Sequence, residues 1–530
     1  MKNVSPPSLE IENQGDTSFY TFEESYFERR SHLIPLDYIF LVTFGEVALR
    51  EGHMRRAVEI TREALAYAHH PNERALIYLS LSRMYRMMIH MQNARAELKR
   101  AFQALDMEYP ERGLFRLLSV LPALFPLFFM RRTQKRFASP ELEERNKILI
   151  ALHEEAGLSA YYMHRSSLLL FQISLHVRKM VSGVGFSFEM VNYRAATATM
   201  FAIYQMRYFA EYYLSQAKKV AVGLHNPAAV AKCRSWEVLL VAYLGDAALS
   251  AGYAESLLTE QKNDLTPYGL RLVCTTLSTN YVIRGKTRLS LRAIDQMMTP
   301  YDATRPKIFS GNKTFIEWYK IPALSFHGEE EAVEEILVNS RAIFSSTDEE
   351  KWQIMLYLGN VLIYYYLSSS RDFNDIKNVL DRFHAIKLSS RHTFLEAQHF
   401  WIGKAYLFLE LFHNKEIDLQ ELKEAVSDVK HMTRLETVKS HHFILTAHLY
   451  CILRRYAKAY ECVEAARLLA KKIDNDWVLY EADKLSIILC YAESRVAEGA
   501  MRYQELSLQL TALGWEGCRY SLEKLVNKYK

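Results

Sequence analysis

The sequence predicts an all-α protein built as a right-handed superhelix, or solenoid, of helical hairpins. Three observations carry this prediction. Glycine (19) and proline (13) are scarce in a chain of 530 residues, whereas chains rich in β-structure need turn residues more often. Helical periodicity continues from Leu33 almost without a break. Small residues recur at fixed offsets of 12 and 7 residues, which indicates repeated pairs of packed helices.

Composition and charge exclude several classes of protein. Half of the residues are apolar, which is enough for large cores, and the length exceeds that of one ordinary compact domain. The net charge of +5 is too small to indicate a nucleic-acid partner. Six dispersed cysteines without CxxC spacing indicate reduced thiols and a cytoplasmic location. The first twenty residues lack the apolar segment of a signal peptide, so we expect none.

The predicted elements follow one another in three parts. Residues 1–33 are polar and acidic, and we expect a poorly ordered arm there. The first half of the solenoid covers residues 34–310 and the second half covers residues 311–530. Short breaks separate the predicted helices, namely "HHPNE" (69–73), "HNPA" (225–228), "KNDLTPYG" (262–269), "TPYDATRP" (299–306), "SSTDEE" (345–350) and "IDNDW" (473–477).

An apolar run, Leu117–Met130, lies within the predicted connecting helix 114–130. Its fourteen residues are too few to span a bilayer, which needs about twenty. We therefore expect a buried connecting helix. A peripheral membrane contact through Arg131 and Arg132, which follow the run, is the less favoured alternative.

Four stretches share one frame of small residues. A small residue on the first helix is followed after 12 residues by an alanine and after 19 by another, with a turn after 7. The four copies are Gly45, Gly52, Ala57 and Ala64; Ser82, Ile89, Ala94 and Ala101; Ala198, Ala210 and Ala217; and Ala447, Ala459 and Ala466. Small side chains on both helices let the two backbones approach. Gly285 and Gly328 are candidate turn glycines of degraded copies.

This frame resembles the tetratricopeptide repeat, a helix–turn–helix unit of about 34 residues. The resemblance implies a superhelix in which the first helix of each hairpin lines the concave face. Over about residues 34–345 the order of segments also resembles the helical half of large bacterial signalling ATPases. The segments that carry this are "RGLFRLLSVLPALFPLFFMRRTQKRF", "ASPELEERNKILIALHEEAGLSAYYM" and "RYFAEYYLSQAKKVAVGLHNP". That resemblance implies a regulatory or scaffold part, with a kinase or ATPase as partner, and brings over no catalytic residue.

Sequence signatures of catalysis and of cofactor or metal binding are missing. "NYVIRGKT" (280–287) approaches a phosphate loop, but Asn280 stands where its first glycine belongs and both flanks are helical. His441, His448 and Cys451 share a helix face without the spacing of a metal site. No GxSxG, kinase loop set or CxxC pair occurs. We expect a protein that is not an enzyme, with no cofactor and no metal.

The concave face supplies the candidate binding residues: Arg50, Arg83, Arg86, Lys404, His441 and His448. Two arginines one turn apart suit a carboxylate or phosphate of a partner, for example an acidic segment, although they also suit a pairing with neighbouring Glu residues. We predict a protein- or peptide-binding module that acts as a regulatory or scaffold component in bacterial signalling. The alternative is a sensor that binds a small ligand inside the superhelix and regulates a partner kinase or ATPase. A long open groove would favour the first, and an enclosed aromatic pocket the second.

Overall fold

The computed structural model describes residues 37–50, 53–88, 90–110, 139–162, 184–298, 313–344, 351–368, 373–386 and 398–529, with residue 390 and a few positions between 163 and 183. All regular structure in these residues is helical, which confirms the all-α prediction. The predicted arm, the connecting helix 114–130 and the boundary at residue 310 lie outside the described residues.

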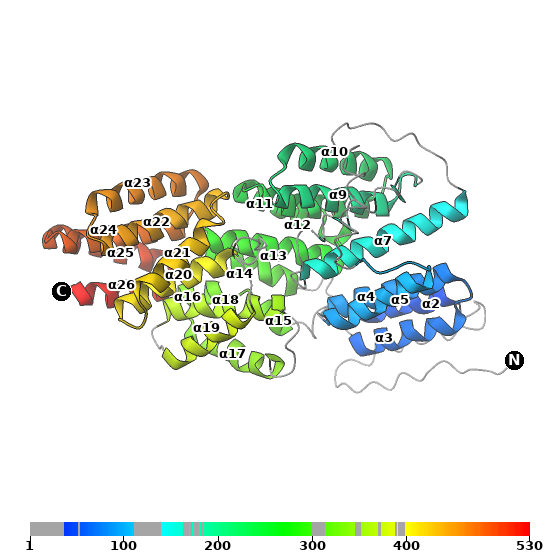
Figure 1. Ribbon diagram of the computed structural model, residues 1–530, viewed down its shortest axis with the longest axis horizontal. Helices are drawn as coiled ribbons and strands as arrows, with labels where there is room; N and C mark the ends of the chain where they lie inside the picture. The colour runs from blue at the N-terminus through cyan, green and yellow to red at the C-terminus, as the bar shows by residue number, and fades with distance from the viewer. Residues whose placement is uncertain are drawn as a thin grey trace.

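The elements of the first half run from one end of an elongated molecule to its middle (Figure 1). They are α2 (Tyr38–Arg50), α3 (Met54–Glu63), the 3₁₀ helix η1 (Ala64–Tyr67), α4 (Pro71–Met87), α5 (Met91–Ala104), α7 (Pro140–Tyr162), α9 (Phe188–Ile203), α10 (Arg207–Gly223), α11 (Pro227–Tyr243), α12 (Ala247–Glu260), η2 (Lys262–Asp264), α13 (Pro267–Ile283) and α14 (Thr287–Met298).

The second half continues to the other end (Figure 1). Its elements are α15 (Lys313–Trp318), α16 (Ile321–His327), α17 (Glu330–Phe344), α18 (Lys351–Leu367), α19 (Phe373–Ala385), α20 (Gln398–His413), α21 (Leu419–Lys430), α22 (Glu436–Ile452), α23 (Tyr456–Ile473), α24 (Asp476–Ala492), α25 (Val496–Leu513) and α26 (Glu516–Tyr529).

The helices begin where the sequence places its breaks, because those breaks hold capping residues. Asn226 accepts a hydrogen bond from the backbone N–H of Ala228, and Pro227 follows it as the first residue of α11. Thr266 caps α13 in the same manner, and Asn475 caps α24 by accepting from Val478. Such a cap contributes about 1 kcal/mol, and proline at the first helical position costs nothing because its missing N–H would have no partner there.

The alanine frame is confirmed by burial. Ala57, Ala94, Ala210 and Ala459 are all fully buried, and so are the alanines that follow each of them by seven residues. In the first copy, a Cβ added to Gly45 would lie 2.0 Å from the Thr61 Oγ1 atom and 3.0 Å from the Ala57 carbonyl oxygen. The helices α2 and α3 therefore pack closely enough to require a glycine.

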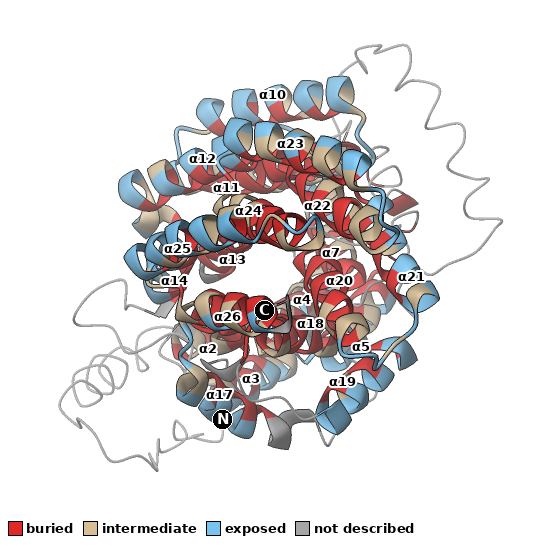
Figure 2. Cartoon of the chain, turned by 90° about the vertical axis from the view of Figure 1, so that its left-hand side faces the viewer, coloured by how far each residue is buried: buried red, intermediate tan, exposed pale blue. Residues whose placement is uncertain are grey.

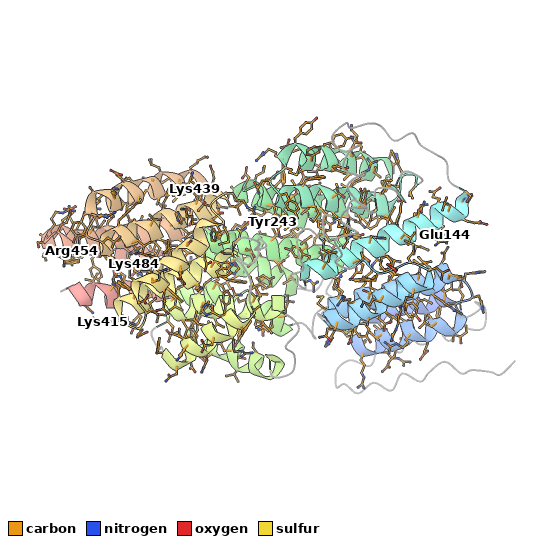
Figure 3. All side chains as sticks on the ribbon, in the orientation of Figure 1. Glu144, Tyr243, Lys415, Lys439, Arg454 and Lys484 are labelled. Atoms are coloured by element: carbon orange, nitrogen blue, oxygen red, sulfur yellow. The ribbon has the colours of Figure 1, made fainter. Side chains whose placement is uncertain are left out.

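Six hairpins whose turn position is described adopt the left-handed conformation there, whether or not the residue is glycine. Gly245, Gly285 and Gly328 have φ between +72° and +94° at the ends of α11, α13 and α16. Gln205, Arg454 and Ser494 hold φ values from 58° to 62° at equivalent turns. Figure 3 marks Arg454 at the end of α22. These turns reverse the chain and place the two helices of each hairpin antiparallel.

Four further hairpins keep the 12-residue offset and the turn of the frame, without alanine and without a small residue at every position. Their pairs at offset 12 are Val238 and Ser250, Ser278 and Ser290, Ile321 and Val333, and Ile487 and Gly499. The Ser278 and Ser290 hydroxyls lie 2.8 Å apart, and the Ser250 hydroxyl donates to the Val238 carbonyl across 2.8 Å. Because serine is small and bonds across the hairpin, it replaces alanine at the helix crossing.

The second half folds back onto the end of the first half. The turn after α13 meets the loop before α24, although these segments are about 190 residues apart in sequence. Arg284 donates to the Ile473 and Asp474 carbonyls, and Lys286 pairs with Asp474 and Asp476 at 2.8 and 2.9 Å. The amide of Asn475 donates to the Ile283 carbonyl across 3.1 Å. These contacts join two remote turns of the superhelix.

The last helix, α26, packs inside the second half against α16, α18 and α24. A buried polar cluster joins three of these helices. The Lys484 Nζ atom on α24 donates to the Tyr366 hydroxyl on α18 at 2.9 Å and to the Ser521 hydroxyl on α26 at 3.0 Å. The Tyr366 hydroxyl donates to Glu481 at 2.5 Å. Figure 2 shows the consequence: buried surfaces face the inside of the ring of helices and exposed surfaces face outward.

Candidate functional site

The predicted arginine pair lies on α4 beside the long helix α7. The buried Arg86 guanidinium binds Glu155 through two hydrogen bonds, Nε to Oε1 at 2.5 Å and Nη2 to Oε2 at 3.2 Å. The Nε atom of Arg83 lies 3.9 Å from Oε2 of the same carboxylate, and 43% of the Arg83 side chain is exposed. Both arginines thus meet a glutamate of their own chain. The side chain of Arg50 lies outside the described residues.

Three cationic side chains lie close to the ring of Tyr268, at the start of α13. The Arg86 guanidinium lies 4.3 Å from the ring centroid, Lys232 Nζ lies 5.3 Å away, and the Arg271 guanidinium 5.7 Å away. Lys232 also pairs with Glu154 across 3.5 Å. Burial lowers the pKa of Lys232, and the nearby Glu154 carboxylate opposes that shift. The cluster joins α4, α7, α11 and α13, and the ring face attracts each cation.

An apolar pocket adjoins this cluster and is called the α7 pocket here. It lies between α7, α9, α11 and α13, opens to solvent on one side and has a free volume of about 80 Å³. The described part of its lining has four aromatic residues: Tyr161, Tyr193, Trp236 and Tyr268. The Tyr161 hydroxyl lies 3.0 Å from that of Tyr243, which Figure 3 marks at the end of α11. Since α7 packs on α4, α5 and α9, it covers the inside of the superhelix here.

The other three predicted residues lie inside the second half. Lys404 on α20 is 7% exposed, its ammonium lies 3.4 Å from Asp428, and burial lowers its pKa. His441 on α22 is fully buried between the Tyr406 hydroxyl, 3.1 Å from Nδ1, and the Ile283 carbonyl, 2.9 Å from Nε2. Nε2 donates to that carbonyl, which favours the protonated ring, but burial outweighs this contact and lowers the pKa of His441 to about 4.

His448, two turns beyond His441 on α22, is 5% exposed. Burial lowers its pKa well below the ordinary value, and the neighbouring His413 and Lys484 add to the shift. The sequence places Lys404, His441 and His448 on the concave side of first helices, whereas the structure covers that side. Contact of these three residues with a partner stays a prediction, and the structure places them inside the chain instead of on its surface.

The "NYVIRGKT" segment forms the turn between α13 and α14. Gly285 has φ of +72°, and a Cβ there would lie 2.6 Å from the backbone nitrogen of Trp477. Lys286 is engaged by Asp474 and Asp476, and the Thr287 hydroxyl lies 3.0 Å from Nε2 of His327. The glycine therefore serves a tight contact between two parts of the chain, in agreement with the predicted inter-helix turn.

The described ranges contain neither a cluster of metal ligands nor a membrane-spanning helix. Within them, no three His, Cys, Asp or Glu side chains stand close enough together to hold one metal ion. None of the helices in these ranges combines the length and apolar character needed to cross a bilayer. The apolar run Leu117–Met130 lies outside the described residues.

The residues that complete these sites carry little signal that predicts them from the sequence. Glu154 and Glu155 stand in "HEEAG" on α7, and nothing in the local pattern connects them to Lys232 or Arg86, which lie tens of residues away. The aromatic wall of the α7 pocket is equally dispersed. The one available signal is Gly157, a glycine inside a 23-residue helix, where a functional or packing reason is needed.

Hairpins, turns and burial together define the class: this is a helical-repeat solenoid of tetratricopeptide-like hairpins. No protein-family model and no curated protein matches the chain. Among solved structures, the crystal structure of yeast Tom70 resembles it over 92% of this chain and 96% of that chain, with 12% sequence identity and a TM-score of 0.30. That TM-score is too low for Tom70 to indicate a partner or an activity for this chain.

Proposed function

We propose that this chain is a protein-binding scaffold that uses the outer face of its hairpins. The supporting observation is a set of large apolar side chains on three successive second helices. Tyr208 on α10 is 66% exposed, Leu249 on α12 is 44% exposed and Tyr253 is 37% exposed. Leu289 on α14 continues the set at 36%. Apolar side chains that recur at the surface along one side of a repeat array mark an interaction site, and tyrosine is enriched in such sites.

Affinity capture with the full chain tests this proposal. The Tyr208→Ser, Tyr253→Ser double variant should lose its protein partner from lysate of the source cells by about tenfold or more, since buried aromatic anchors dominate binding energy. Tyr520→Ser is the matched control, because Tyr520 is 40% exposed but lies on α26. Equal recovery of the same partner by parent and double variant would refute the outer-face scaffold.

We further propose that the partner is a kinase or ATPase of a bacterial signalling system. The resemblance of residues 34–345 to the helical half of signalling ATPases supports this. A cytoplasmic location is part of the proposal. It is supported by the six cysteines, all within the described residues, which form no disulfide, and four of which are buried. Mass spectrometry of the captured material should identify an ATP-hydrolysing or kinase domain. A captured partner without a kinase or ATPase domain would contradict the proposed partner. A cellular location that oxidises these thiols would contradict the cytoplasmic location.

An acidic segment of that partner is proposed to reach Arg83. This guanidinium is half exposed and 3.9 Å from the Glu155 carboxylate, so a second carboxylate can approach it from solvent. Arg83→Glu should weaken capture of the partner, whereas Arg55→Glu, at a side chain 97% exposed on α3, should not. Partner binding unchanged by Arg83→Glu would remove Arg83 from the binding surface.

A further inference from the structure

The α7 pocket has the size and lining of a small-molecule site. Its free volume of about 80 Å³ is several times the roughly 10–15 Å³ that one water molecule needs, so a small organic group can enter it. Aliphatic side chains such as Leu158, Met200 and Leu239 form most of the wall, together with the aromatic residues named above. A cavity with this wall favours an apolar guest, because burial of apolar surface drives binding.

Two buried polar groups of the wall have no partner. Trp236 is 6% exposed and Thr197 is 3% exposed, and both line the pocket. Neither the indole N–H of Trp236 nor the Thr197 hydroxyl forms a hydrogen bond within the described part of the chain. Buried polar groups are almost always hydrogen-bonded, because an unmet donor costs stability. Since the indole nitrogen can only donate, the missing partner at Trp236 is an acceptor.

Gly157 gives a second, independent sign that space is kept open. It lies within α7 and lines the pocket, and a Cβ added there would meet no atom within 4 Å. Glycine destabilises a helix interior, so a glycine is usually retained for a close contact or a special φ angle. Gly157 has neither, and what its missing side chain provides is room in the cavity.

The charge of the wall restricts the guest. Glu154 lines the pocket, whereas its partner Lys232 does not, and the described lining contains no lysine or arginine. A carboxylate guest would therefore face a carboxylate in a poorly solvated site. We propose that the α7 pocket binds a small, mainly apolar, uncharged molecule that carries an oxygen acceptor, with the Trp236 N–H and the Thr197 hydroxyl as donors. The proposal goes beyond the scaffold function and does not depend on it.

The test is calorimetric titration of the purified full chain with octan-2-one, and with octanoate as the charged counterpart. The parent should bind octan-2-one saturably, and octanoate at least about tenfold more weakly. Thr197→Val nearly keeps the volume of the wall and removes one donor, so it should weaken binding about fivefold. Trp236→Phe also removes one donor, although it enlarges the cavity, and should weaken binding as well.

Gly157→Met fills the cavity and should abolish binding. Gly252→Met is the matched control, because a Cβ at Gly252 on α12 also meets no atom within 4 Å, yet this glycine does not line the pocket. Circular dichroism establishes that each variant is folded, and the Thr197→Val result stands even if Gly157→Met unfolds. Absence of saturable octan-2-one binding by the parent would overturn the proposal, and so would equal binding by parent and Thr197→Val. Octanoate binding as tight as octan-2-one binding would overturn the choice of an uncharged guest.

Discussion

Replacement of glycine by alanine in a helix interior should lower the free energy of unfolding at one site of this chain and raise it at two others. Gly359 lies on α18 against α20, and a Cβ there would be 2.0 Å from Cγ and 2.2 Å from Cδ1 of Phe400. Both residues are buried, and Phe400 is only 1% exposed, so its ring has little room to move. Gly157 and Gly252, by contrast, have no atom within 4 Å of the added carbon.

The expected magnitudes follow from two opposing effects. Alanine is favoured over glycine in a helix by about 1 kcal/mol, whereas forcing a methyl group into a packed site costs about 1–3 kcal/mol. With contacts as short as those at Phe400, overpacking reaches the upper part of that range. Gly359→Ala should therefore lower the free energy of unfolding by about 2 kcal/mol, while Gly157→Ala and Gly252→Ala should raise it by about 0.5–1 kcal/mol.

Urea unfolding followed by far-ultraviolet circular dichroism measures these differences. The double variant Gly359→Ala, Phe400→Leu should recover part of the loss, because the smaller side chain leaves space for the methyl group. If Gly359→Ala were as stabilising as Gly252→Ala, the close approach of α18 and α20 would be wrong, and the argument from Cβ contacts would fail at Gly157 as well.

Four further predictions concern other parts of the chain. Ala210→Leu should overpack the α9–α10 crossing and cost about 1–3 kcal/mol in urea unfolding. Glu155→Gln should cost about 3 kcal/mol, because it leaves the buried Arg86 charge without a carboxylate, and adding Arg86→Met should restore much of that loss. His441 has a pKa of about 4 in the folded chain and an ordinary pKa of 6.5 in the unfolded chain. Between these pH values the unfolded chain binds a proton at this ring and the folded chain does not. Stability should fall as pH decreases from about 6.5 to 4, and His441→Gln should reduce that slope by at most about 1.4 kcal/mol per pH unit. Titration with magnesium and ATP or GTP should give no saturable heat, since Lys286 is held by two aspartates, and a micromolar dissociation constant lost in Lys286→Ala would contradict this.

The local architecture could be predicted from the sequence because the hairpin imposes its own short-range rule. Ala57, Ala94, Ala210 and Ala459 are constrained by a helix crossing only 12 residues away, so their spacing is visible in the chain itself. Repeats with serine or valine at the helix crossing could not be recognised from the sequence, as at Ser278 and Ser290. Such substitutions keep the geometry while removing the residue type that identified it.

The site could not be predicted in the same manner, because its residues come together only in the superhelix. Arg86 and Arg83 were found on α4, but the carboxylate that they meet, Glu155, is 69 residues beyond Arg86. The interior position of His441 depends on Ile283, which precedes it by 158 residues. No periodicity of about 34 residues encodes either distance.

The contact between the turn after α13 and the loop before α24 changes the mechanics of the array. Repeat proteins hold together through nearest neighbours, so they usually fray from their ends and stretch like springs. Here two points about 190 residues apart are joined by the contacts of Arg284, Lys286 and Asn475. The intervening hairpins therefore form a closed ring. A force applied at the two termini must break these contacts before it can extend the hairpins between them. Folding of this part must also bring distant segments together, which raises its contact order and slows it relative to an open array of the same helices.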